Sequence, residues 1–160
     1  MSRKEVIVCV DDEEGVLRVL RAQLGARFGH ECQIATARSG DEAVALFDEL
    51  TREGEQIALV IADQIMPGMK GAELLEIVDR RLPTTTKVLL TGQAGLDAVI
   101  DAINRAHLHH YIAKPWDETT LLLVADSEAI SCWFSLTRRY WRNKFSTMSS
   151  SVVSSHGLAI

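Results

Sequence analysis

Buried strands and one-sided helices are the first features that the pattern of apolar and polar positions predicts. Short runs of consecutive apolar residues alternate with longer stretches in which apolar residues recur every three or four positions. The first pattern indicates strands covered on both faces, and the second indicates helices with one buried side. Strands are predicted at 6–10, 31–37, 57–62, 87–91 and 110–113. Helices are predicted at 14–28, 40–53, 71–82, 96–106 and from 117 onward.

Local signals support these boundaries. Ser39 and Glu42 have the spacing of a capping box that opens a helix, Gly29 is placed to end the helix before it, and Pro83 ends the third. Strands that alternate with helices of 10–15 residues predict an α/β fold with a parallel sheet and right-handed crossovers.

Polar side chains follow the predicted strands where each strand ends. Asp11 and Asp12 follow the first strand, Asp63 ends the third, Thr91 ends the fourth and Lys114 follows the fifth. The carboxyl ends of parallel strands share one edge, where open α/β folds hold their ligands. Three carboxylates there require a cation, and oxygen ligands suit Mg²⁺ or Mn²⁺. Carboxylates, a hard metal ion, an ammonium and a hydroxyl together predict phosphoryl-transfer chemistry.

Four motifs, in order at the predicted strand ends, resemble the receiver domains of two-component response regulators over about residues 4–128. The motifs are Val10-Asp11-Asp12-Glu13, Asp63-x-x-Met66-Pro67-x-x-x-Gly71, Leu90-Thr91-Gly92 and Tyr111-x-x-Lys114-Pro115-Trp116. The resemblance implies a flavodoxin-like (βα)5 fold, doubly wound, with strand order 2-1-3-4-5. It also implies a switch that is phosphorylated by a histidine kinase or a phosphotransfer protein and signals through protein–protein contacts, without multiple-turnover catalysis.

The resemblance assigns the metal ligands and the phosphoacceptor. Asp63 matches the residue that becomes an aspartyl phosphate. Asp12 matches a direct Mg²⁺ ligand, and Asp11 matches an acidic neighbour that acts through metal-bound water. Asp63 itself and the backbone carbonyl of Ile65 match the remaining protein ligands.

The resemblance also assigns the groups that respond to the phosphoryl group. Thr91 matches the hydroxyl that moves toward it, and Lys114 matches the lysine that pairs with one of its oxygens. Tyr111 matches the aromatic switch residue that reports phosphorylation to the surface formed by the fourth helix, fifth strand and fifth helix. The Lys114–Pro115 peptide is expected to be cis, as in the family.

Three positions adjust the expected chemistry. Gly92 is small and leaves room for a phosphoryl group. The apolar side chain of Ile65 cannot orient an attacking water, and Gln93 can hydrogen-bond but cannot act as a base. The sequence therefore predicts slow self-dephosphorylation.

Charge and composition limit the partners. The net charge of −5 divides into −9 for residues 1–128 and +4 for residues 129–160, which contain no acid. An acidic body argues against nucleic-acid binding by the main domain. No apolar run of about 18 residues predicts a membrane span, and the N-terminus does not resemble a signal peptide. Three cysteines without metal spacing favour reduced thiols in a cytoplasm, with Cys9 and Cys32 buried in strands.

Several other side chains receive structural interpretations. His107, His109 and His110 resemble a metal cluster, but they cross a helix-to-strand joint that should separate them. Trp116 is expected to cover the start of the last helix, and Lys70 and Lys87 are expected to be surface charges.

The last predicted helix is longer than a receiver domain needs. We divide the chain into a receiver domain at 1–128, an extended aromatic-rich helix at 129–145 and a serine-rich flexible tail at 146–160. Five of the nine aromatic residues lie in 133–145, on two adjacent apolar stripes. The pattern predicts a homodimer or partner interface, such as a short coiled-coil seam. The alternatives are a helix that folds back on its own domain, or the start of a linker to an output domain.

Other functions remain open at this point. The chain resembles receivers fused to signalling enzymes or hybrid kinases, so it is also interpreted as a module detached from a larger protein. A Mg²⁺-dependent phosphohydrolase with an aspartate nucleophile would keep that aspartate in an Asp-x-Asp pair after its first strand. In this chain Asp63 lies at the third strand, and Ile65 occupies the position of the second aspartate. A degenerate receiver that only binds a partner would lack part of the set Asp11, Asp12, Asp63, Thr91 and Lys114, which this chain has in full.

Overall fold

A single parallel sheet forms the centre of the fold. The computed structural model describes residues 5–92 and 96–126 of the 160-residue chain. The five strands lie in the order β2-β1-β3-β4-β5, and every neighbouring pair is parallel, as predicted. The strands are β1 (Glu5–Val10), β2 (Cys32–Ala37), β3 (Gln56–Asp63), β4 (Thr86–Thr91) and β5 (His110–Ala113).

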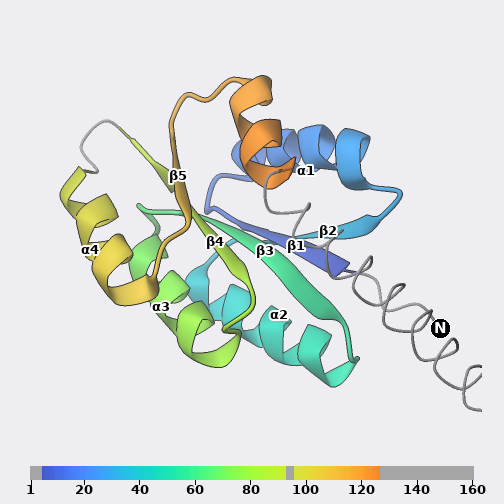
Figure 1. Cartoon of the computed structure of the whole chain (residues 1–160), viewed down its shortest axis with the longest axis horizontal. Helices are drawn as coiled ribbons and strands as arrows, with labels where there is room; N and C mark the ends of the chain where they lie inside the picture. The colour runs from blue at the N-terminus through green and yellow to red at the C-terminus, as the bar shows by residue number, and fades with distance from the viewer. Residues whose placement is uncertain (1–4, 93–95, 127–160) are drawn as a thin grey trace, which may run out of the picture.

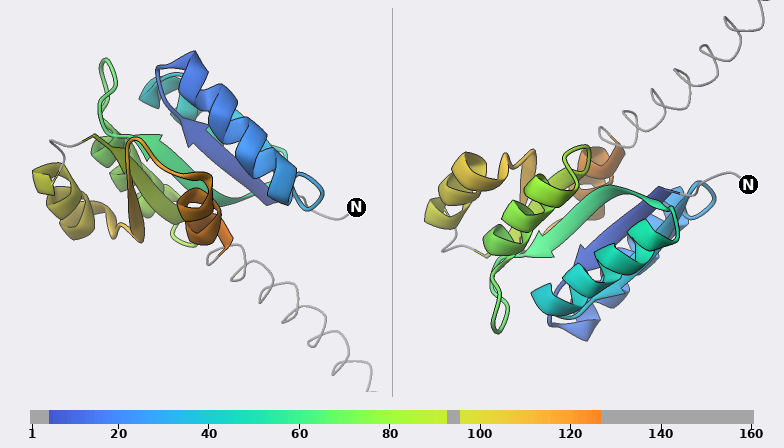
Figure 2. Two further views of the ribbon diagram at one scale, coloured as in Figure 1. Left: turned by 90° about the horizontal axis from the view of Figure 1, so that it is seen from above. Right: turned by 90° about the horizontal axis from the view of Figure 1, so that it is seen from below.

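Helices cover both faces of this sheet. The helices are α1 (Glu14–Phe28), α2 (Gly40–Arg52), α3 (Gly71–Arg81) and α4 (Leu96–Ala106), and residues 118–126 are also helical. As Figures 1 and 2 show, α1 and the 118–126 helix lie on one face, and α2, α3 and α4 lie on the other. This arrangement is the doubly wound, flavodoxin-like fold that the sequence predicts.

Two hydrophobic cores explain why the strands are apolar at consecutive positions. Neighbouring side chains of a strand point to opposite faces. Ile7 and Cys9 of β1 pack in the core under α1 and the 118–126 helix, whereas Val6 and Val8 pack in the core under α2, α3 and α4. Burial on both faces leaves no polar side along the central strands.

Local capping follows the predicted signals, with one difference. The Ser39 hydroxyl accepts a hydrogen bond from Glu42 N at 3.1 Å at the start of α2. The Glu42 carboxylate, however, accepts from Arg38 N at 2.8 Å, one residue before the position expected in a capping box. The Asp117 side chain accepts from Thr120 N at 2.9 Å, so the helix begins after Asp117 as predicted.

Lys87 contradicts the prediction of a surface charge, because its residue is only 1% exposed. Its ammonium donates to Asp79 Oδ1 of α3 at 2.7 Å, and His107 Nδ1 lies 2.8 Å from Asp79 Oδ2. The hydrogen bonds with Lys87 and His107 hold the pKa of Asp79 below its ordinary value. A lysine can be buried here because a carboxylate faces it. Lys70 is exposed, as expected.

The three histidines near β5 do not form a metal cluster. His107 contacts Asp79, whereas His109 Nδ1 accepts a hydrogen bond from Lys87 N at 3.2 Å. Within residues 5–92 and 96–126, no group of potential metal ligands includes a histidine.

The predicted extended helix at 129–145 and the tail at 146–160 lie outside the described residues. Among the helices that are described, none has the length and apolar character needed to cross a membrane.

Candidate phosphoryl-transfer site

Three carboxylates meet at the carboxyl edge of the sheet. Asp11 follows β1 and Asp63 is the last residue of β3, and these strands are neighbours in which Val10 pairs with Ala62. Together with Asp12 they offer oxygen atoms that all lie within 4.8 Å of one another. Asp11 is fully buried, Asp63 is 5% exposed and Asp12 is partly exposed. Carboxylates this close repel each other and favour a bound cation.

Lys114 brings an ammonium group into this cluster. Its Nζ lies 2.8 Å from Asp11 Oδ2 and 2.8 Å from Asp63 Oδ1. Its backbone N–H donates to the carbonyl oxygen of Thr91 at 2.8 Å, which holds the end of β5 beside β4. The following peptide, Lys114–Pro115, is cis as expected. One ammonium cannot neutralise three carboxylates, so the cluster keeps an excess of negative charge.

Burial and pairing act in opposite directions on the charged groups. Burial raises the pKa of Asp63, although the hydrogen bond from Lys114 acts against this rise. Burial lowers the pKa of Lys114, but its hydrogen bonds to Asp11 and Asp63 outweigh burial and leave that pKa raised. The site therefore holds a charged lysine beside a carboxylate whose ionised form is poorly solvated.

Tight turns after β1 and β3 orient two of the carboxylates. Glu13 N donates to Asp11 Oδ1 at 2.9 Å, and Ile65 N donates to Asp63 Oδ2 at 3.1 Å. Each turn uses one carboxylate oxygen and leaves the other for Lys114. The nucleophilic group of the proposed chemistry is therefore held by backbone as well as by an ion pair.

The remaining predicted residues lie around this cluster. Thr91 is 5% exposed at the end of β4, and its hydroxyl donates to the carbonyl oxygen of Gly92 at 3.1 Å. A Cβ on Gly92 would meet nothing within 4 Å, so space is open there. Ile65 turns its side chain to solvent with 73% exposure, and Tyr111 on β5 is 55% exposed. Gln93 lies outside the described residues.

Two glutamines and a glycine make contacts around the site that the sequence did not predict, although Gly71 belongs to the motif that begins at Asp63. Gln64, next to Asp63, accepts a hydrogen bond from Ala72 N at 2.9 Å and thereby fixes the start of α3. A Cβ on Gly71 would collide with the carbonyl oxygen of Asp63, so only glycine lets α3 begin against this strand end. Gln23 of α1 accepts from Trp116 Nε1 at 3.1 Å, while the Trp116 ring packs on the core as expected. The motif spacing marks Gly71 but not its contact with Asp63, and no periodicity or motif spacing signals the contacts of the two glutamines.

The donor set fits a small divalent cation. Asp11, Asp12 and Asp63 supply hard oxygen ligands at compatible distances, and their charge exceeds what Lys114 can neutralise. Mg²⁺ and Mn²⁺ prefer such ligands. The cluster could therefore hold one of these ions.

Comparison with known proteins places this arrangement in a family. A family model described as the response regulator receiver domain matches residues 7–126. The chain is 34% identical over 117 residues to the hydrogenase transcriptional regulatory protein HoxA of Cupriavidus necator, a match that covers 72% of this chain and 22% of HoxA. It is 31% identical over 117 residues to the chemotaxis protein CheY homolog of Campylobacter jejuni, covering 72% of this chain and 85% of that protein.

Solved structures show the same relationship. The signal receiver domain of an HD domain-containing protein from Pseudomonas fluorescens Pf-5 superposes with a TM-score of 0.70 at 30% identity, covering 81% of this chain and 97% of that one. The chain spans less than a quarter of the length of HoxA and of the NtrC regulators that it matches.

Proposed function

Because this chain belongs to the family of response regulator receiver domains, we propose that it is a phosphorylation-controlled signalling module whose phosphoacceptor is Asp63. The phosphoryl group would come from a histidine kinase or a phosphotransfer protein. One observation carries the proposal: Asp63 lies among two further carboxylates with Lys114 Nζ at 2.8 Å from its Oδ1. That constellation suits group transfer to a carboxylate better than simple structural pairing.

The transfer forms one bond and breaks one. A carboxylate oxygen of Asp63 attacks the phosphorus of a phosphohistidine, and the electron pair of the broken N–P bond returns to the imidazole. Lys114 lies where it can pair with a phosphoryl oxygen while it keeps its contact with Asp11. Asp11, Asp12, Asp63 and the backbone carbonyl of Ile65 would hold Mg²⁺ or Mn²⁺, which supplies positive charge against the phosphoryl oxygens.

We propose that Thr91 and Tyr111 convert this event into a surface change. The Thr91 hydroxyl, now bonded to the Gly92 carbonyl, would turn to the phosphoryl group and vacate space that Tyr111 can enter. The support is an exposed apolar surface on α4 and β5, where Leu96 is 69%, Ile100 50% and Tyr111 55% exposed. Exposed apolar patches often mark protein-binding sites, so we propose that the module signals by binding a partner protein at this surface.

The module is proposed to lose its phosphoryl group slowly. Ile65 presents an exposed apolar side chain beside Asp63 and cannot position a water for attack. We expect no multiple-turnover activity, only self-catalysed phosphorylation and slow self-dephosphorylation. An aspartyl phosphate that decays within seconds in Mg²⁺ would contradict this.

The charge of the chain and the state of its thiols suggest its binding partners and its cellular location. We propose that the receiver domain, taken as 1–128, contacts no nucleic acid because of its acidic charge, and that it contacts no membrane. The extended helix at 129–145 is proposed to join two copies, with 146–160 as a flexible tail. Cys9 and Cys32 are free thiols whose pKa values burial raises to about 12 and about 11, which fits a reducing cytoplasm.

A second proposal keeps the same chemistry in a larger protein. HoxA and NtrC, which carry the matching domain, are named as transcriptional regulators and extend well beyond it. The same receiver could serve as one module of such a regulator, or of a signalling enzyme or hybrid kinase. Any contact with DNA would then belong to another domain.

Phosphorylation by a small donor tests the proposal. Wild-type protein incubated with Mg²⁺ and acetyl phosphate should gain one base-labile, acid-stable phosphate in its intact mass. Asp63→Asn should gain none, whereas Asp48→Asn, at an exposed carboxylate of α2, should match the wild type. Labelling that persists in Asp63→Asn would refute the assignment.

A further inference from the structure

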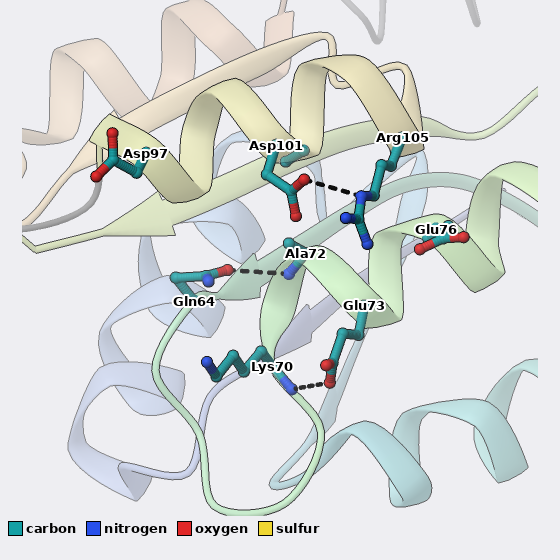
Figure 3. A pocket seen from close by; sticks show the side chains of 9 residues that line it. Gln64, Lys70, Ala72, Glu73, Glu76, Asp97, Asp101 and Arg105 are labelled. Atoms are coloured by element: carbon teal, nitrogen blue, oxygen red, sulfur yellow. Dashed lines mark hydrogen bonds and ion pairs between the residues drawn. The ribbon is translucent and has the colours of Figure 1, made fainter.

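A groove between α3 and α4 is separate from the carboxylate cluster and takes no part in the proposed chemistry. It encloses about 300 Å³ and shares no residue with that cluster. Figure 3 shows the side chains that line it, from α3, from α4 and from the connection between β3 and α3. The groove is lined by Gln64, Lys70, Ala72, Glu73, Glu76, Asp97, Asp101, Ala102 and Arg105.

Its charge favours a cationic ligand. Four carboxylates line the groove against one lysine and one arginine. Asp101 pairs with Arg105 at 2.8 Å and Glu76 with Arg80 at 3.5 Å, but these arginines are about two-thirds exposed. Exposed pairs of this kind bind weakly and exchange readily. Within the described residues, Asp97 makes no ion pair.

The floor of the groove offers a hydrogen-bond donor that the described structure does not use. Gln64 is only 9% exposed, and its Oε1 accepts from Ala72 N at 2.9 Å. Its amide nitrogen makes no hydrogen bond with any residue in 5–92 or 96–126. Figure 3 shows this side chain extending into the groove between the start of α3 and Asp97. This nitrogen is open to solvent in the groove, where it can donate to an acceptor such as a peptide carbonyl.

A ligand that offers both cationic side chains and peptide carbonyls is a basic peptide, and this chain contains a basic segment of its own. Residues 129–145 hold Arg138, Arg139, Arg142 and Lys144, with no acid and with five aromatic residues. We propose that the groove between α3 and α4 binds the segment 129–145 of a second copy of the chain. This inference deepens the homodimer part of the proposed function by naming the surface that receives the segment.

The position of the 118–126 helix favours a second copy over the same chain. That helix packs beside α1, on the face of the sheet opposite the groove (Figures 1 and 2). Asp126, the last described residue, pairs with Arg27 of α1 at 3.1 Å. The described part of the chain therefore ends on the face of the sheet opposite the groove. Two copies can exchange segments reciprocally, and the symmetric pair then closes.

Two charge-reversed variants of the full chain test this exchange. The groove variant carries Glu76→Lys and Asp101→Lys, and the segment variant carries Arg138→Glu and Arg139→Glu. Each variant alone places like charges in contact and should weaken self-association on the order of 100-fold relative to wild type. A control with Asp48→Lys and Glu49→Lys, on exposed positions of α2, changes the net charge as much as the groove variant and should dimerise like wild type.

Mixing the two variants separates exchange from intramolecular docking. In an equimolar mixture, the basic segment of the groove variant meets an acidic groove, and the acidic segment of the segment variant meets a basic one. Sedimentation velocity at tens of micromolar should therefore show a heterodimer. A wild-type monomer, variants that dimerise alone like wild type, or a mixture that stays monomeric would each overturn the proposal. Acetyl phosphate labelling of the same samples should be unchanged, so a failure of the chemistry would appear separately.

Discussion

The carboxyl group of Asp63 lies where its ionised form is poorly solvated. Burial raises the pKa of its carboxyl above the ordinary 3.8, so its ionised form costs more free energy in the folded chain than in the unfolded one. This penalty is absent below pH 3.8 and is complete once the pH exceeds the raised folded value. Lys114 offsets it only in part, because the lysine is shared with Asp11.

Removing that charge should stabilise the unphosphorylated fold. Without divalent ions at pH 7, Asp63→Asn should raise the free energy of unfolding by about 1 kcal/mol in urea titrations. The exposed Asp48→Asn should change it by less than about 0.5 kcal/mol. A clear loss of stability in Asp63→Asn would contradict this and would mean that the carboxylate mainly stabilises the fold through its ion pair with Lys114.

The buried pair of Lys87 and Asp79 predicts unequal effects of its two removals. Asp79→Asn leaves the ammonium of Lys87, a residue only 1% exposed, without its carboxylate partner. This variant should lower the free energy of unfolding by about 3 kcal/mol. Lys87→Met keeps the buried volume apolar and leaves Asp79 with His107, so it should cost about 1 kcal/mol or less. Equal losses of the free energy of unfolding in the two variants, measured by urea titration, would contradict this prediction.

The pH dependence of the Asp79 contribution has a defined sign. Its pKa is lowered mainly by the hydrogen bond from Lys87, so its stabilisation is complete above pH 3.8 and is lost as the pH falls through the lowered folded value. The stability difference between wild type and Asp79→Asn should therefore shrink below about pH 4. A difference that grows on acidification would have the wrong sign.

At the scale of elements, the start of α3 is fitted to the end of β3. A Cβ on Gly71 would strike the Asp63 carbonyl, so Gly71→Ala should push α3 away from the strand. We expect a loss of about 2 kcal/mol and slower labelling by acetyl phosphate. Gly25→Ala in α1 has nothing within 4 Å and should instead stabilise by about 0.5–1 kcal/mol. Wild-type labelling in Gly71→Ala would contradict a role of Gly71 in positioning Asp63.

The elements also show why some features could be predicted and others could not. Strand and helix positions follow from apolar periodicity and from the signals at the ends of the elements, which are properties of neighbouring residues. The strand order follows only from the family resemblance that the motifs at the strand ends carry. Lys87 was misplaced because its partner, Asp79, comes from another element and no local pattern joins the two. The contact of Trp116 with Gln23 is of the same kind.

At the scale of the whole molecule, a bound divalent ion should stabilise the fold. At about ten times its dissociation constant, Mg²⁺ should add about 1.4 kcal/mol to the free energy of unfolding, because it relieves repulsion among Asp11, Asp12 and Asp63. A chelator should reverse the effect, and Asp12→Asn should remove most of it. Stabilisation that is unchanged in Asp12→Asn would place the ion elsewhere.

The most direct test of the central claim locates the phosphorylated atom. Wild-type protein labelled with acetyl phosphate in Mg²⁺ is reduced with borohydride, which converts an aspartyl phosphate to homoserine, and is then mapped by peptide mass. We expect homoserine at position 63 and unmodified aspartate at Asp11 and Asp12. Homoserine at either of those positions, or none in the labelled protein, would contradict it.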